Sequence, residues 1–221
     1  MKGAIFGVWL AALLLGGFMA QWHQHLLAGP KPLVQSKRSS SVLMDALGEG
    51  RTLMARFLYF KAEVYHEVLD QQGVAHNKQK DTLPLLRMVT YLDPSLTETF
   101  DIIAFDLWKG WNQPDEAIAL LDEALRFNPS SQQLWARKAL ILFQEKRYAE
   151  AMPSIAKDVE YSTEEFEVLN ANRLKLWAAK KLNEPELEQE ALDVLLQYRP
   201  DDVNYNREQR RLQKMRESEA Q

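Results

Sequence analysis

One stretch constrains the fold of this chain more than any other: "GWNQPDEAIALLDEALRFNPSS", residues 110–131, has turn signals on both sides of a helical pattern. Asn112 suits a left-handed turn residue that ends one helix, and Pro114 with two acidic residues behind it suits the first turn of the next. Asn128-Pro129 stops that helix. Between these signals the apolar residues recur at helical spacing, at Ala117, Leu120, Leu121, Ala124, Leu125 and Phe127.

The same signals recur along the chain. Two helix starts agree in detail, "NQPDE" at 112 and "NEPEL" at 183, and three stops agree, "YLDP", "RFNP" and "QYRP". A further unit fits by period, because Ala117 and Ala151 stand about 34 residues apart. A period of roughly 34 residues with paired helices predicts a helical solenoid. Three asparagines stand at one constant distance before a proline: Asn77 before Pro94, Asn112 before Pro129, and Asn183 before Pro200.

With these residues the chain resembles the tetratricopeptide repeat family, whose pattern alternates a large residue and a small one in each helix of a hairpin. Unit 98–131 matches it with Trp108, Ala117, Leu121, Ala124 and Pro129, and unit 132–165 with Trp135, Ala139, Ala151 and Ile155. In the second of these, Asp158 and Thr163 replace the usual Ala and Pro. Units 63–97 and 169–202 match less well, and Glu188 stands where a small residue is expected. The resemblance implies an all-α, right-handed solenoid of helical hairpins.

The resemblance also implies where a partner binds, because the first helix of each hairpin lines the concave face in this family. The outward positions of the two best units are Asp106 and Lys109 in the first, and Leu140, Phe143 and Gln144 in the second. The alternative for Leu140 and Phe143 is burial against an additional N-terminal helix. Three tryptophans in first helices are interpreted as core residues that pack against the neighbouring helix, at Trp108, Trp135 and Trp177.

The N-terminus carries a second feature, an apolar run from Gly3 to Ala20 without a charged residue. About 20 apolar residues cross a bilayer as a helix, so residues 3–22 are predicted to form a membrane anchor with Trp22 at its interface. A cleaved secretory signal and a buried soluble helix are the alternatives, but the possible cleavage sites place Phe18 or Leu15 where a small residue is preferred. The flanking positive charges nearly balance. We expect a cytoplasmic N-terminus and an extracytoplasmic body, as in a single-pass protein of the bacterial inner membrane.

The predicted organisation is therefore an anchor over 1–25, a linker over 26–41 and a solenoid over 42–202. The linker is rich in Pro, Gly and Ser. Two glycines at 48 and 50 predict a break before a long helix over about 51–70. Residues 203–221 are predicted to form a polar capping helix or tail.

Composition excludes several kinds of chemistry. The absence of cysteine rules out thiolate catalysis and Cys-ligated metals. Positions 1–40 carry four of the 27 basic side chains and none of the 31 acidic ones, so the remaining chain has a net charge of −8, which disfavours nucleic acid as a partner. His23 and His25 form an i, i+2 pair, which does not face one metal on a helix although it could on an extended chain, and they are interpreted as polar residues at the membrane interface. His66 and His76 match no known triad spacing. We predict no catalytic, cofactor or metal site.

These observations predict a non-enzymatic, membrane-anchored protein-binding scaffold, acting as an accessory subunit or assembly factor of a membrane protein complex. The alternative is an extracytoplasmic, chaperone-like holder of newly translocated or unfolded clients. A broad apolar groove with weak binding to many clients would favour the alternative. The sequence does not indicate the oligomeric state.

Overall fold

The computed structural model describes residue 48, residues 50–74 and residues 80–219. The chain divides into two units, Met1–Gly48 and Glu49–Gln221. The predicted anchor, the linker and the segment 42–47 lie outside the described residues. Within the described ranges, all regular structure is helical, which confirms the all-α prediction, and no helix there is long and apolar enough to cross a bilayer.

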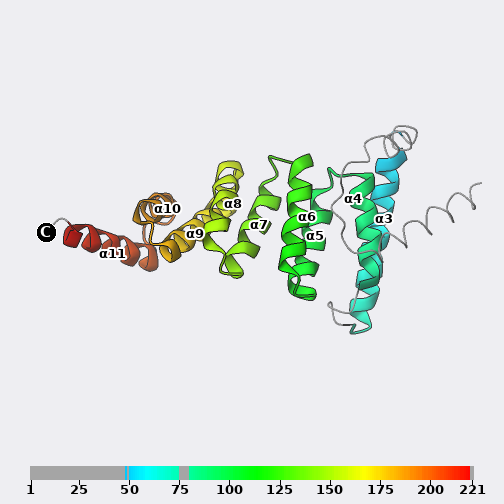
Figure 1. Ribbon diagram of the computed structural model, residues 1–221, viewed down its shortest axis with the longest axis horizontal. Coiled ribbons are helices and arrows are strands. Elements are labelled where there is room, and N and C mark those ends of the chain that lie inside the picture. The colour runs from blue at the N-terminus through cyan, green and yellow to red at the C-terminus, as the bar shows by residue number, and fades with distance from the viewer. Residues whose placement is uncertain (1–47, 49, 75–79, 220–221) are drawn as a thin grey trace, which may run out of the picture. The chain divides into compact units, whose positions relative to one another are not determined.

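The helices follow one another closely along the second unit (Figure 1). The long apolar helix predicted over 51–70 is observed as Gly50–Gln71. The helix bounds are α3 (Gly50–Gln71), α4 (Leu83–Leu92), α5 (Thr97–Phe105), α6 (Pro114–Phe127), α7 (Gln132–Gln144), α8 (Tyr148–Tyr161), α9 (Glu165–Leu182), α10 (Pro185–Tyr198) and α11 (Val203–Glu219), with a 3₁₀ turn at Lys80–Thr82 and a π turn at Asp106–Gly110.

The helices pack in pairs that are consecutive in the sequence. α3 contacts α4, α5 contacts α6, α7 contacts α8, and α9 contacts α10, while α11 packs on α10. In addition, α5 contacts α7 and α7 contacts α9, so the first helices of three successive hairpins are neighbours. We call α5 with its π turn, α7 and α9 the A-helix row. This row is where the family resemblance places the binding face.

Three turns give the hairpins a common frame. Asn112, Lys146 and Asn183 have φ of 55°, 61° and 57°, and each lies between the two helices of a hairpin. The prediction of Asn112 as a left-handed turn residue is confirmed. Five residues after each turn residue come Ala117, Ala151 and Glu188. Glu188 therefore occupies the position of the two alanines, which settles the register of the last hairpin.

Glu188 is a buried acid at a position that is otherwise small. Its side chain forms an ion pair with Arg211 of α11, and Arg211 also contacts Glu208 at 2.7 Å. Where the other two hairpins bury an alanine methyl group, Glu188 makes a charged contact with α11. This pair attaches α11 to the α9–α10 hairpin.

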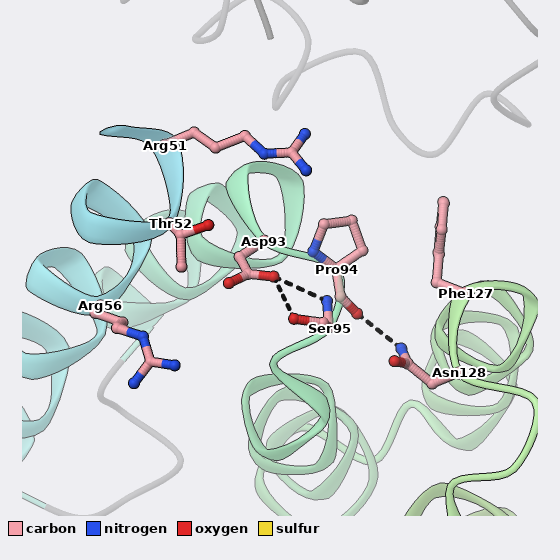
Figure 2. Close-up of a pocket in the computed structure, with 8 residues that line it drawn as sticks. All are labelled: Arg51, Thr52, Arg56, Asp93, Pro94, Ser95, Phe127 and Asn128. Carbon is pink, nitrogen blue, oxygen red and sulfur yellow. Dashed lines mark hydrogen bonds between the residues drawn. The ribbon is translucent and has the colours of Figure 1, made fainter. Parts of the chain in front are cut away.

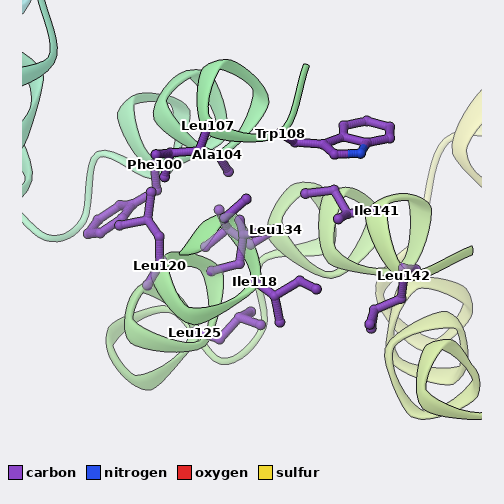
Figure 3. Packing of buried hydrophobic residues seen from close by; sticks show 14 of the residues in the cluster. Phe100, Ala104, Leu107, Trp108, Ile118, Leu120, Leu125, Leu134, Ile141 and Leu142 are labelled. Atoms are coloured by element: carbon purple, nitrogen blue, oxygen red, sulfur yellow. The ribbon is translucent and has the colours of Figure 1, made fainter. Parts of the chain in front are cut away.

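The hairpins share a main core cluster that runs from α3 to α9. In Figure 3 its side chains project from α5 and its π turn, α6 and α7 toward one another. A second cluster is built from α9, α10 and α11. Leu174 and Ala178 of α9 belong to the main cluster, while Leu169 and Leu176 of the same helix belong to the second. α9 is therefore the helix that both clusters share.

A second buried acid, Asp158, ties α7 to α8. It takes the position that Ala124 holds in the preceding hairpin, where the repeat pattern has a small residue. Its Oδ1 accepts a hydrogen bond of 2.7 Å from Gln132 Nε2. Burial raises the pKa of Asp158 to about 6, although the bond from Gln132 opposes the shift. The folded state therefore binds a proton at Asp158 more tightly than the unfolded chain does.

This raised pKa predicts how stability depends on pH. Between the ordinary Asp pKa of 3.8 and about 6, the unfolded chain is ionised at Asp158 while the folded protein still holds the proton, so raising the pH lowers the free energy of unfolding. Asp158→Asn keeps an oxygen acceptor for Gln132 without the charge. We expect it to stabilise the protein by about 1–2 kcal/mol at pH 7 and by nearly nothing at pH 3.5. Urea unfolding of both proteins at the two pH values measures this, and equal stability at pH 7 would contradict it.

Candidate functional site

Four large apolar side chains lie on the three helices of the A-helix row. We call Phe105, Leu140, Phe143 and Trp177 the apolar row. Phe105 and Trp177 are 39% and 52% exposed, whereas Leu140 and Phe143 are half-buried against the main core. The ring of Phe143 lies 6.4 Å from that of Trp177, which joins α7 to α9.

At the other end of the apolar row, Arg137 of α7 lies against Phe105 of α5. Its guanidinium lies 5.3 Å from the centre of the Phe105 ring, one turn before Leu140 on α7. Asp101 of α5 holds it with two hydrogen bonds, of 2.5 Å from Nε and 2.9 Å from Nη2. The hydrogen bond to Asp101 raises the pKa of Arg137, although burial opposes the shift. This bidentate contact fixes α5 against α7 and keeps a cation on the Phe105 ring.

The π turn decides which residue of the first helix faces outward. Trp111 N–H donates to Asp106 O at 3.0 Å, an i→i+5 bond that accommodates one extra residue. Buried Ala104 consequently lies eight residues before Asn112, whereas buried Ala139 lies seven before Lys146. Phe105 therefore takes the position that Leu140 and Trp177 hold in the next two hairpins.

This insertion corrects one of the sequence-based choices. Asp106 is only 4% exposed, so Phe105 rather than Asp106 is the outward residue at this place on the helix. Lys109 is exposed, with its Nζ 3.6 Å from the centre of the Trp108 ring, and Gln144 is exposed at the end of α7. Leu140 and Phe143 are half-buried because they pack against the main core. Within the described part of the chain, the rest of each side chain stays accessible.

The tryptophans divide between core and surface. Trp108 is buried, as the core interpretation predicts, and its Nε1 donates to Glu145 at 2.9 Å. Trp135 is half-buried and donates to Pro129 O at 2.8 Å. Trp177 is half-exposed, so the core interpretation is wrong for it. The missed signal is the distance to the turn, because Trp177 precedes Asn183 by six residues, just as Leu140 precedes Lys146.

Lysines border the apolar row at both ends. The position that Phe143 holds on α7 is taken by Lys109 in the preceding hairpin and by Lys180 in the following one. Lys181 comes directly after Lys180. Lys180 also reaches Glu208 of α11 at 2.8 Å. The face thus offers an apolar and aromatic middle with cationic ends. A segment with apolar side chains and acidic flanks has the matching chemistry.

A separate open pocket of about 560 Å³ lies where α3 begins, near the α4–α5 turn and the end of α6 (Figure 2). Its polar groups hold the loops together: Asp93 Oδ1 accepts from Ser95 N at 3.1 Å and from Ser95 Oγ at 2.5 Å, and Asn128 Nδ2 donates to Pro94 O at 2.7 Å. These contacts give the pocket a structural role between hairpins. Among the described residues, no group of three or more His, Asp or Glu side chains could hold a metal ion.

Comparison with known proteins gives a likeness of fold. A solved structure described as "MamA RS-1 ArsTM double mutant" superposes with a TM-score of 0.54 at 17% identity, over 71% of this chain and 85% of that one. MamA contains tetratricopeptide repeats, so the likeness supports a tetratricopeptide-like fold for the helical unit. No family model matches the chain, and no curated protein matches it.

Proposed function

We propose that the chain is a non-enzymatic scaffold, a right-handed tetratricopeptide-like solenoid that binds a protein segment on its apolar row. The observation that carries this proposal is that the row bridges three successive hairpins: Phe105 of α5 lies against Arg137 of α7, and Phe143 of α7 lies against Trp177 of α9. Aromatic anchors dominate the energy of many protein interfaces. A single extended or helical segment that follows the row would contact all four side chains at once.

The row favours a defined partner over unselective capture of clients. Its charged residues have neighbours that hold them: Lys109 lies over the Trp108 ring, Lys180 contacts Glu208, and Arg137 is held by Asp101. Fixed charges select partners by complementarity and reject segments with basic flanks. This is why we favour an accessory subunit or assembly factor over the chaperone-like alternative.

We further propose that residues 3–22 anchor the scaffold in a bacterial inner membrane, with the solenoid on the extracytoplasmic side. The apolar length of this segment supports the anchor. Confinement to a membrane raises the effective concentration of the row toward a partner in the same membrane. This arrangement supports a partner that belongs to a membrane complex, which is the partner that we propose.

Photocrosslinking in native membranes tests the proposal. A photoreactive residue at Gln144, exposed next to Phe143, is compared with one at Ala156, exposed on α8. Gentle extraction and identification of the products follow. One or two membrane proteins captured at fixed stoichiometry from position 144, and not from 156, would support the scaffold. Many unrelated products would favour the chaperone-like alternative, and equal products from both positions would contradict binding on the row.

A further inference from the structure

The outer face of α3 carries a second apolar surface, separate from the apolar row. Leu53, Phe57, Phe60, Val64 and Val68 are all between 41% and 72% exposed. Their spacings of four, three, four and four residues place them on one stripe of the helix. The opposite side of α3 packs inward, through Ala55 and Ala62. The helix is therefore apolar on both sides, which is typical of a helix packed between two neighbours.

The stripe is self-complementary about a point between residues 60 and 61. In an antiparallel pairing of two copies of α3 around that point, Leu53 lies opposite Val68 and Phe57 opposite Val64, with Phe60 at the centre. Spacings of three and four residues are those by which helices pack side by side over several turns. A two-fold axis through the centre would bury the whole stripe of both copies.

The charges beside the stripe agree with the same centre. Arg56, Glu63 and Glu67 follow one another at seven and four residues, so they lie along one edge of the stripe. In the antiparallel arrangement this edge faces its own copy, which places Arg56 between Glu63 and Glu67 of the second copy. Two such contacts form by symmetry. A parallel arrangement would instead set this edge against the other edge of the stripe, and Arg56 would lose both acidic neighbours.

We propose that α3 pairs antiparallel with α3 of a second copy of this chain, through the stripe Leu53 to Val68 and the charged edge. The pairing leaves the apolar row unused, so it does not rest on the proposed function. It also covers the first described helix of the solenoid, where the stack would otherwise end in an apolar surface.

The absence of cysteine in the sequence makes a sharp test possible. Lys61→Cys places the only thiol next to the axis, with the two copies offset by about 2 Å along the helices. Glu67→Cys on the same helix separates its two copies by about 20 Å along the axis. The full chain, in the membrane or the soluble fraction of the cells that make it, is treated with a short bis-maleimide linker. We expect a dimer of the chain from Lys61→Cys and at least tenfold less from Glu67→Cys.

Charge reversal tests the register. In the Lys61→Cys background, Arg56→Glu alone and the pair Glu63→Arg with Glu67→Arg should each reduce the dimer several-fold, and all three changes together should restore it. Phe57→Asp should abolish it, whereas Phe127→Asp, at a similarly exposed phenylalanine on α6, should not. Circular dichroism of each variant checks the fold.

The other possible occupants of the stripe give different products. A monomer in which the thiol at position 61 does not react would mean that another segment of the same chain covers the stripe. A product with a different protein would mean a heterologous partner. Either result overturns the proposal, and so does equal dimer yield from positions 61 and 67. None of these results bears on photocrosslinking at Gln144, so the two proposals fail independently.

Discussion

Replacement of Trp177 by alanine is expected to weaken partner binding by about 30-fold or more, because a half-exposed tryptophan at an interface carries about 2–3 kcal/mol when truncated. Trp177 is half-exposed and its ring contacts Phe143, so the substitution removes the α9 end of the apolar row. The measurement is the affinity for the partner captured from position 144, by titration in detergent or nanodiscs.

Tyr198→Ala is the matched control. Tyr198 is 40% exposed at the end of α10, away from the A-helix row, and its loss should change affinity less than twofold. Phe105→Ala should weaken binding in the same direction as Trp177→Ala, because the two residues lie at opposite ends of one surface. An unchanged affinity for both variants would mean that the partner binds elsewhere on the molecule.

Substitution of Arg211 by methionine should destabilise the α9–α11 part of the molecule by about 2–3 kcal/mol, because it leaves Glu188 buried without its cation. The cost is below the largest values for buried pairs because Arg211 is itself partly exposed. Glu188→Ala should be close to neutral, since Ala117 and Ala151 occupy the same position in other hairpins. The double substitution Glu188→Ala with Arg211→Met should recover most of the loss.

Hydrogen exchange of the α10 and α11 amides measures these effects locally. We expect wild type and Glu188→Ala to show similar amide protection, the double variant somewhat less, and Arg211→Met much less. If Glu188→Ala lowers protection as much as Arg211→Met does, the pair itself stabilises the fold. The buried charge would then not be the reason for the loss.

The parts of the fold that could be predicted are those with local signals. Asn112 in a left-handed turn and Pro114 at the first position of α6 are both observed where the sequence places them. Prolines and turn asparagines act on the backbone of their own residue, so one sequence suffices to interpret them. The long helix α3 also followed from its apolar content between glycine and polar residues.

The parts that could not be predicted depend on residues far away or on hydrogen-bond geometry. The π turn at 106–110 has no residue-type signature, and the family pattern therefore selected Asp106 one residue beyond the exposed Phe105. The burial of Glu188 depends on Arg211, which lies 23 residues later on another helix. The apolar stripe of α3 could not be predicted, because the sequence does not show which apolar side of this helix packs inward and which stays exposed.

The sharing of α9 between two buried clusters has a consequence for thermodynamic linkage. Trp177 stands on the helix that supplies Leu169 and Leu176 to the C-terminal cluster, so a ligand that needs Trp177 binds only when α9 is in place. Ligand at a hundred times its Kd stabilises the binding-competent state by about 2.7 kcal/mol. α10 and α11 complete this C-terminal cluster with α9. Binding on the proposed face would therefore reduce local unfolding of α10 and α11 without a change of conformation.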